Sequence, residues 1–295
     1  MKYLFLGLIS LFLTIHSYSQ EESTRLENAL LWEISGNNLK AASYLYGTIH
    51  LIGEADFFLT EATKASFEKA QQVAFEIDME EMTDFTQLMP LMMQAFMAGD
   101  TTLADLLSQE DYALVQEHFE EMGMPLMFLE RIKPMFLSAM ADTDLADLQG
   151  ESGAVSYEME MMEMAQKRKV PIEGLETAAF QMSLFDSIPY KIQAQMLVDA
   201  VKADDSGDDQ FQAMVELYKK QDIEGMQTMV QEDEAGIGKY EELLLVKRNK
   251  NWIPVMAKMM VQKPTFFAVG AGHLGGKYGV ITLLREAGYT LKPLY

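Results

Sequence analysis

The chain has 295 residues, of which 49% are hydrophobic, and it carries a formal net charge of −22. Nucleic acids and anionic membranes bind clustered basic residues, so this acidic balance argues against both as partners, and the sequence predicts no nucleic-acid binding. There is no cysteine, which excludes disulfides, thiolate nucleophiles and Cys-ligated zinc sites.

The first twenty residues have the pattern of a bacterial export signal. Lys2 precedes an apolar run from Tyr3 to Ile15, and small and polar residues follow it up to Gln20. The apolar run is too short to span a membrane comfortably, although an uncleaved anchor is the alternative. We therefore predict a Sec-type signal peptide over residues 1–20, a periplasmic or secreted location, and no transmembrane segment after cleavage.

The remaining residues, 21–295, are predicted to form a single domain that opens with a β-hairpin. Residues 30–35 and 43–49 are rich in strand-forming side chains, and Gly36-Asn37-Asn38 between them is typical of a tight turn. The second strand ends in Gly47-Thr48-Ile49-His50. Residues that directly follow strands commonly carry the chemistry of α/β proteins, so His50 is a candidate functional residue.

The next predicted strand contains a carboxylate. Residues 60–71 have a helical pattern, and Val73-Ala74-Phe75-Glu76-Ile77-Asp78 follows as an apolar strand. A carboxylate among apolar neighbours is costly unless it is paired or bound to a metal. Glu76 is therefore a candidate site residue, with a structural ion pair to an arginine as the alternative. Asp78 is a weaker candidate.

Methionine-rich helical patterns occupy the middle of the chain. Residues of about 83–150 are predicted to form a helical insertion or cap, in which we interpret His118 as a surface or packing residue. A helix over Ser156–Lys169 contains the run Met159-Glu160-Met161-Met162-Glu163-Met164. Thioethers can bind copper(I) or form an adaptable apolar surface. We favour the simpler interpretation, in which methionine takes the place of leucine in the core.

A short strand from Val170 then leads through Glu176-Thr177 into a helix, and helical patterns continue over about residues 183–260. The last of these helices, from Tyr240 to Met260, carries Arg248-Asn249 and is expected to kink or restart at Pro254. Arg248 is a candidate to stabilise an oxyanion or to pair with Glu76.

The histidine motif has a second copy near the end of the chain. An apolar stretch over residues 266–269 runs into Gly270-Ala271-Gly272-His273-Leu274, and a helix and a closing strand follow. Both copies read as a strand, then Gly-x-x-His, then Leu. The matched motifs suggest equivalent positions in two pseudo-related halves of one sheet, which would bring His50 and His273 together. A structural role for both histidines does not explain this match.

Two imidazoles and a carboxylate form the kind of zinc-type site that leaves a position open for water. A bound ion would lower the pKa of that water, and Glu76 or Glu176 would take its proton. The sequence thus predicts a hydrolytic centre with His50 and His273 as metal ligands, and a divalent ion such as Zn, Mn or Co.

Five segments together resemble the TraB/GumN family, which is related to the Tiki metalloproteases. The segments are Tyr46–His50, Phe75–Asp78, Gly174–Thr177 with Gln181, Lys247–Asn249 and Val269–Leu274. Their order and spacing match from about Leu26 to Tyr295. The resemblance implies a mixed α/β core, a proposed metal-dependent protease or hydrolase activity, and a pocket completed by Gly47, Gly270, Gly272, Asn249, Asp78 and Gln181.

One position departs from the family pattern. Members often carry an aspartate before the helix that precedes Gly-Leu-Glu-Thr, where this chain has Ser156-Tyr157-Glu158. If that aspartate takes part in catalysis, the activity of this chain is altered.

We predict an exported α/β metallohydrolase with a central mixed sheet and a large helical insertion, acting on a peptide or small-molecule substrate. A metal-independent hydrolase with a histidine base and a non-catalytic periplasmic binding protein are the alternatives.

Overall fold

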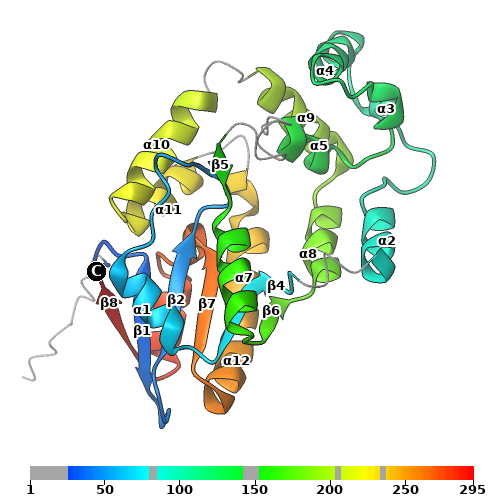
Figure 1. Cartoon of the computed structure of the whole chain (residues 1–295). Coiled ribbons are helices and arrows are strands. Elements are labelled where there is room, and N and C mark those ends of the chain that lie inside the picture. The colour runs from blue at the N-terminus through cyan, green and yellow to red at the C-terminus, as the bar shows by residue number, and fades with distance from the viewer. Residues whose placement is uncertain (1–25, 80–84, 142–152, 203–206, 233–236) are drawn as a thin grey trace, which may run out of the picture.

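A six-stranded mixed sheet forms the centre of the chain in the computed structural model (Figure 1), which describes residues 26–79, 85–141, 153–202, 207–232 and 237–295. The predicted signal peptide lies outside the described residues. The strand order is β6-β4-β7-β2-β1-β8. The strands are β1 (Leu31–Gly36), β2 (Ser43–Thr48), β4 (Gln72–Ile77), β6 (Ile172–Glu176), β7 (Thr265–Gly270) and β8 (Tyr289–Leu294).

The strand directions divide the sheet into two parts. β6, β4, β7 and β2 run parallel to one another, whereas β1 pairs antiparallel with both β2 and β8. The β1–β2 pair confirms the predicted hairpin. Asn37 and Asn38 in its turn have positive φ values of 45° and 60°, which asparagine tolerates better than most residues. The predicted mixed α/β class is confirmed.

A second, two-stranded sheet joins distant segments beside the main one. β3 (Ile52–Gly53) pairs antiparallel with β5 (Ala154–Val155). β3 directly follows the first histidine motif and β5 directly precedes a long helix. This pairing therefore holds the start of that helix next to His50.

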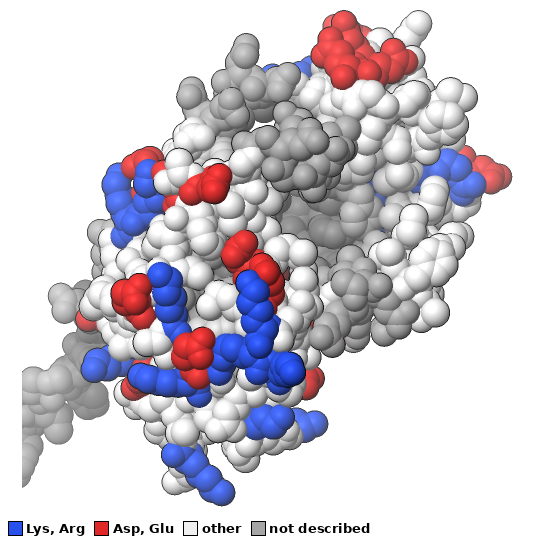
Figure 2. Space-filling view, viewed as in Figure 1, with Lys and Arg blue, Asp and Glu red and all other residues white. Residues whose placement is uncertain are grey.

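Helices cover both faces of the main sheet. α1 (Glu61–Lys69) and α7 (Tyr157–Arg168) lie on one face, and α12 (Lys247–Gln262) and α13 (Val280–Glu286) lie on the other (Figure 1). Thr60 and Ser156 cap the first two helices through their side chains. Charged residues of both signs gather over the lower part of the face shown in Figure 2, whereas the region of α2 (Phe85–Gln94), a helix without charged residues, is mostly uncharged.

The predicted helical insertion is helical where it is described, and it builds a separate small core. Its elements are α3 (Leu103–Leu106), α4 (Gln109–Glu121), η1 (Leu126–Phe128) and α5 (Pro134–Ala141), and they pack with the later helix α9 (Tyr190–Lys202). The buried side chains of this second cluster are Leu103, Val115, Phe119, Leu126, Leu137, Leu197, Val198 and Val201. His118 is half-buried and packs edge-on against Phe119, with ring centroids 5.6 Å apart, so it is a packing residue. That residues 21–295 form one domain stays a prediction.

The other helical elements complete the chain and lie mainly beyond the upper ends of the strands in Figure 1. Besides the helices of the second cluster, they are α8 (Ala178–Leu184), η2 (Phe185–Ser187), α10 (Gly207–Lys219), α11 (Ile223–Glu232), η3 (Ile237–Tyr240), the π-helical turn η4 (Glu242–Val246) and η5 (Ala271–His273).

The expected restart of the helix at Pro254 is wrong, whereas a kink there stays a prediction. α12 continues through Pro254 to Gln262, and it begins at Lys247 rather than at Tyr240 because the π-helical turn η4 precedes it. Pro254 is exposed. The carbonyl four residues earlier, which proline cannot hydrogen-bond, belongs to the exposed Lys250 and can be solvated instead.

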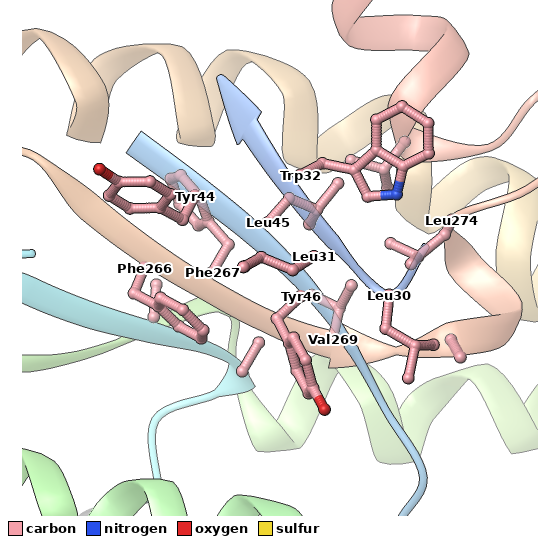
Figure 3. Close-up of a cluster of buried hydrophobic side chains, with 14 of the residues drawn as sticks. Leu30, Leu31, Trp32, Tyr44, Leu45, Tyr46, Phe266, Phe267, Val269 and Leu274 are labelled. Carbon is pink, nitrogen blue, oxygen red and sulfur yellow. The ribbon is translucent and has the colours of Figure 1, made fainter. Parts of the chain in front are cut away.

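The central strands are held by a dense apolar core. In Figure 3, Trp32, Leu45 and Phe267 come from the adjacent strands β1, β2 and β7, and each is fully buried. Burial of a large apolar side chain contributes roughly 1.5–3 kcal/mol. The strand ends that carry the histidine motifs thus project from a tightly packed support. No helix in the described ranges is long and apolar enough to cross a membrane.

Candidate active site

Four neighbouring parallel strands bring the predicted residues to one edge of the sheet. The strands β6, β4, β7 and β2 are consecutive in the sheet, and they end near Glu176, Glu76, His273 and His50 respectively. The carboxyl ends of parallel strands are where open α/β sheets bind ligands. The two histidine motifs follow adjacent strands, but Gly47 pairs with Val269 rather than with Gly270, so the motifs are offset by one position.

A cavity of about 510 Å³ opens above these strand ends. Its polar lining residues include Thr48, His50, Glu76, Gln181, Arg248 and His273. Together with Gly270 and Gly272, we call these residues the floor of the cavity. Gly47, Glu176, Asn249 and the half-buried Asp78, which were also predicted for the pocket, are not among the described residues that line it.

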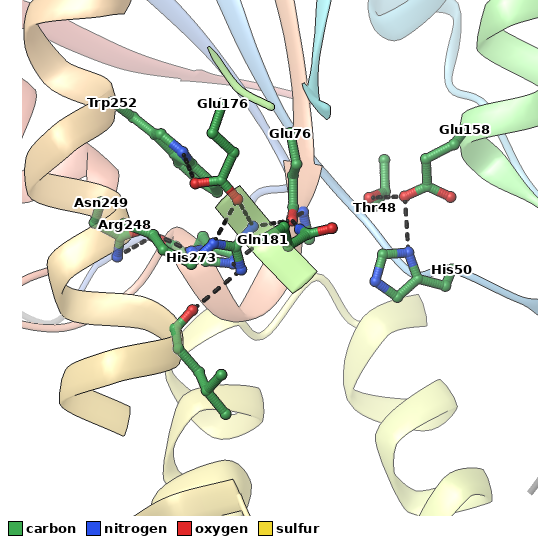
Figure 4. Close-up of polar contacts among 12 residues, drawn as sticks. Thr48, His50, Glu76, Glu158, Glu176, Gln181, Arg248, Asn249, Trp252 and His273 are labelled. Carbon is green, nitrogen blue, oxygen red and sulfur yellow. Dashed lines mark hydrogen bonds and ion pairs between the residues drawn. The ribbon is translucent and has the colours of Figure 1, made fainter. Parts of the chain in front are cut away.

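Arg248 is the centre of the polar network in Figure 4. Its Nε donates to Glu176 Oε1 at 2.8 Å, and its Nη2 lies 2.5 Å from Glu76 Oε2 and 2.6 Å from Glu176 Oε1. Nη1 donates to the carbonyl of Leu244 at 3.1 Å. The guanidinium is buried and stacks over the Trp252 ring at 4.9 Å. The predicted pairing of Arg248 with Glu76 is present, and Arg248 pairs with Glu176 as well.

The carboxylate of Glu76 is ionised in this network. Burial alone would raise its pKa, but the neighbouring His273 and Arg248 and the N–H of Gly270 together hold the pKa below its usual value. Oε1 accepts the Gly270 N–H at 2.9 Å, and Oε2 accepts from Gln181 Nε2 at 3.1 Å. Both oxygens are therefore engaged within the chain.

His273 is enclosed by α12 and by the end of β7. Asn249 Nδ2 donates to the carbonyl oxygens of His273 and Tyr278, so its Oδ1 faces His273 Nδ1 at 2.6 Å, and we assign the ring proton to Nδ1. Nε2 then accepts from Arg248 Nη1 at 3.1 Å. Burial lowers the pKa of His273 to about 4, so this ring is neutral at neutral pH.

His50 occupies the opposite kind of environment. Its side chain is 78% exposed, and Nδ1 lies 3.2 Å from Glu158 Oε1. Thr48 donates to the same oxygen at 2.7 Å. The hydrogen bond to Glu158 raises the pKa of His50. Figure 4 shows the other ring nitrogen on the side of the ring that faces Glu76 and His273.

The motif glycines have different reasons to be glycine. A Cβ on Gly47 would lie 2.6 Å from the Leu274 side chain, so the two motifs pack too closely for any larger residue. A Cβ on Gly270 would lie 3.3 Å from Glu76 Oε1, which is tight. A Cβ on Gly272 would meet no atom within 4 Å. Of these three motif glycines, Gly47 and Gly270 are therefore sterically constrained and Gly272 is not.

The donor atoms suit a divalent cation in kind. His50 and His273 each have Nδ1 held by another side chain, as metal-binding histidines usually do, and Glu76 supplies a carboxylate. In the described part of the chain, no three His, Asp or Glu side chains lie close enough to share one ion. Arg248 Nη1 lies where a ligand of His273 Nε2 would bind. The donor types therefore fit a metal ion, but binding would require Arg248 to release His273 and the three side chains to move closer together.

Sequence reasoning missed the role of Glu158, Thr48 and Trp252. Glu158 stood out only as a departure from a family pattern, although Ser156 marked the start of its helix. Trp252 donates to Glu176 Oε2 at 3.0 Å and packs at a tilt of 40° against the ring of His273, with ring centroids 4.5 Å apart. Trp252 lies one helical turn after Arg248, and this spacing is the signal that could have placed its ring beside Arg248 in the site.

The sequence is similar to known proteins over most of its length. A model of the TraB/PrgY/gumN family matches residues 30–293. The metalloprotease TIKI1 of Danio rerio is 22% identical over 320 residues, which cover 90% of this chain and 63% of that protein. The chain thus spans less than two thirds of the length of this relative. No solved structure gives a significant match.

Proposed function

The chain belongs to the TraB/PrgY/gumN family, as its motifs predicted, and from this premise we propose that it is an exported, metal-dependent hydrolase that cleaves peptide bonds. One observation carries the proposal. His50 and His273 each have Nδ1 held by another side chain and line the same cavity as Glu76. Such a contact fixes the tautomer and the ring orientation of a metal-binding imidazole. The distant similarity to a metalloprotease supports the same reaction class.

The residues that would hold the ion are His50, His273 and Glu76. A bound Zn, Mn or Co ion would supply Lewis acidity and a bound water of lowered pKa. Glu158 and Asn249 fix the ring orientation of the two histidines, so each presents Nε2 for binding. The lowered pKa of His273 keeps its Nε2 unprotonated at neutral pH. The pKa of His50 is raised to about 9, so His50 would have to release a proton to hold the ion.

Arg248 has a separate part in this proposal. Glu176 holds its Nε and Nη2, and Trp252 in turn holds Glu176. Arg248 can therefore release His273 and Glu76 while it remains anchored on Glu176. A guanidinium in this position stabilises negative charge that develops on a substrate oxygen. We propose that Glu176 positions Arg248 rather than accepting a proton itself.

A hydrolase that uses a histidine base without a metal is the second candidate. The observation that favours it is the His50–Glu158 pair, because a carboxylate on Nδ1 orients an imidazole and strengthens it as a base. In this case Nε2 of the neutral form of His50 takes the proton of the attacking water. Because the pKa of His50 is raised to about 9, this form is the minor one at neutral pH, and the rate should rise as the pH approaches 9. His273 would then stay bound to Arg248 throughout.

We also propose export to the periplasm or the medium, on the pattern of residues 1–20. Mass spectrometry of the protein from fractionated cells tests it. The expected result is a mature chain that starts near Gln20 or Glu21 outside the cytoplasm. A cytoplasmic chain that retains Lys2 would overturn export without affecting the hydrolase.

The test of the hydrolase begins with metal content. The mature protein is purified without a histidine tag, and its metals are measured by mass spectrometry in wild type and in a His50→Ala, His273→Ala double variant. His118→Gln is the matched control, since it removes the packing histidine of α4. Peptide hydrolysis is then followed before and after dialysis against a chelator, and after the metal is restored.

Each outcome separates the candidates. Near-stoichiometric metal in wild type and in His118→Gln, lost in the double variant together with activity, supports the metallohydrolase. Hydrolysis that survives chelation and requires His50 supports the histidine base. Metal-free protein without turnover, which binds peptides nonetheless, points to the periplasmic binding protein instead.

A further inference from the structure

We propose that the cavity selects peptide segments in which a bulky, uncharged apolar side chain lies next to the bond to be cleaved, and that it binds them inside a chain rather than at a charged terminus. This inference rests on the proposed function, because it names the substrate class of the same site. The observations that carry it are the composition of the cavity wall and the pairing of the charges on its floor.

The wall of the cavity is built from apolar side chains on separate elements. α8 and η2 contribute one side, α10 and α11 contribute another, and the π-helical turn η4 contributes a third. The apolar residues that line it are Ile49, Leu184, Phe185, Met214, Met226, Val230, Leu244 and Leu245. Long, flexible methionine and leucine side chains adapt to apolar ligands of different shape. Such a wall favours a large apolar group and offers nothing to a charged one.

The charged groups that line the cavity already have partners. Among the described lining residues, the basic and acidic side chains are His50, Glu76, Arg248 and His273, and the hydroxyl of Tyr218 donates to the carbonyl of Gly47. His50 pairs with a carboxylate behind it. Arg248 is shared between Glu76 and Glu176, so its positive charge is fully compensated within the chain. In the metal-free protein the described lining thus holds no unpaired cation for a substrate carboxyl terminus, and both oxygens of Glu76 are already hydrogen-bonded within the chain.

The size of the cavity fits a short stretch of chain. Its volume of about 510 Å³ lies within the range of roughly 300–1,000 Å³ that is usual for ligand pockets. That is room for a few residues. Because the reactive residues lie on the floor and the apolar wall stands above them, a bound segment places its apolar side chain on the wall and its backbone on the floor.

The expected selectivity follows from burial. Transfer of a Leu, Met or Phe side chain from water to an apolar wall improves binding by roughly 10- to 100-fold. A charged side chain in the same place loses its hydration without gaining a partner. We therefore expect at least ~10-fold discrimination between apolar and charged side chains.

The first experiment measures binding apart from turnover. Peptides blocked at both ends, by acetylation and amidation, carry Leu, Phe, Asp or Lys at one central position. Their affinities for the metal-free mature protein are measured by calorimetry, and their cleavage by the metal-loaded protein is measured by mass spectrometry. We expect Leu and Phe peptides to bind at least ~10-fold more tightly than Asp and Lys peptides. Freeing the termini should not improve binding.

The second experiment changes the wall. Met214, half-buried on α10, lines the cavity and is replaced in Met214→Lys, which keeps an unbranched chain of similar length. The matched control is Met93→Lys, because Met93 is 66% exposed on α2 and is not a cavity residue. We expect Met214→Lys to reverse the preference toward Asp, and Met93→Lys to leave it unchanged. If Met214→Lys lowers the melting temperature by several degrees, Val230→Lys on α11 repeats the test.

The outcomes distinguish this inference from the proposed function. Binding that favours apolar peptides supports the inference even if nothing is cleaved, and that combination would overturn the hydrolase alone. Cleavage without preference, or with preference for charged side chains or free termini, overturns the inference and leaves the hydrolase standing. A protein that binds none of the blocked peptides also overturns the inference. An unchanged preference in both wall variants contradicts the role of the wall.

Discussion

The two histidine motifs have the same pattern and follow adjacent strands, yet their histidines occupy opposite environments. The side chain of His50 is 78% exposed, whereas that of His273 is 6% exposed. His50 contacts a carboxylate, Glu158, from a helix on one face of the sheet. His273 contacts a neutral amide, Asn249, from a helix on the other face. One pattern has thus produced one exposed, acid-paired imidazole and one buried, amide-paired imidazole.

The difference shows which properties a local pattern determines. The strand and the glycine place each histidine at the same edge of the sheet, because β2 and β7 are parallel neighbours. The partners that set the charge of each ring come from elsewhere in the sequence. The pKa of His50 is raised and the pKa of His273 is lowered as a result. A matched motif therefore predicts a shared location but not a shared protonation state.

The largest effect is expected when the network around the buried histidine loses its cation. Arg248→Met leaves Glu76 and Glu176 buried without their guanidinium partner, which typically costs about 3–5 kcal/mol of unfolding free energy. Arg248→Lys keeps the charge but not the forked geometry, and it should lie between this variant and wild type. Urea denaturation monitored by tryptophan fluorescence gives the values.

Lys250→Met is the control for this change on the same helix. Lys250 is exposed, so the loss should be within about 0.5 kcal/mol. An Arg248→Met variant as stable as the control would show that the two carboxylates are not ionised together in the folded protein.

The next effect separates the glycines of the motifs. Gly47→Ala forces a Cβ to within 2.6 Å of the Leu274 side chain, and overpacking of this kind typically costs about 1–3 kcal/mol. Gly272→Ala has open space and should change the unfolding free energy by less than about 0.5 kcal/mol. Thermal denaturation of the two variants side by side checks the prediction, and equal stabilities would contradict the close contact between the motifs.

The opposite pKa shifts predict opposite responses to pH in the metal-free protein. The hydrogen bond to Glu158 raises the pKa of His50 to about 9. Its stabilising contribution is complete below the unfolded value of about 6.5 and is lost as the pH rises toward 9. Burial lowers the pKa of His273 to about 4. The unfolded chain then binds the proton first, so stability is lost as the pH falls from about 6.5 toward 4.

Proton NMR of the chelated protein can follow each imidazole, since the whole chain has only 4 histidines. The difference in unfolding free energy between wild type and His50→Gln should become smaller above about pH 9. The unfolding free energy of His273→Gln should fall less steeply than that of wild type between about pH 6.5 and about pH 4, although the loss of packing lowers it at every pH. The contribution of His50 should stay below about 1 kcal/mol, because water screens an exposed pair. If the rings of His50 and His273 titrate over the same pH range, the opposite pKa shifts of the two histidines are contradicted.

The sequence allowed prediction of the elements and of most residues at the strand ends, because both depend on local features. Alternating strand formers marked the hairpin, and the cost of a carboxylate in an apolar strand marked Glu76. The residues that pair with the two histidines could not be found in this way. Glu158 and His50 are 108 positions apart and meet because of the β3–β5 pairing, which is two residues long on each side. Strands this short have no periodic pattern.

The smallest change in stability should come from Glu158→Gln, yet this variant tests the comparison most directly. A neutral amide in place of the carboxylate would not attract a proton to His50, so the pKa of His50 should fall toward its ordinary value of about 6.5, while His273 is unaffected. The unfolding free energy should change by less than about 1 kcal/mol, because the pair is largely solvated on the His50 side.

Glu160→Gln is the matched control, since Glu160 is exposed in the first turn of the same helix. It removes the same charge near the same helix end without touching His50. If His50 titrates alike in both variants, the raised pKa reflects the acidity of the whole chain rather than its bond with Glu158. If only Glu158→Gln lowers it, a single carboxylate from another segment accounts for the high pKa that distinguishes His50 from His273.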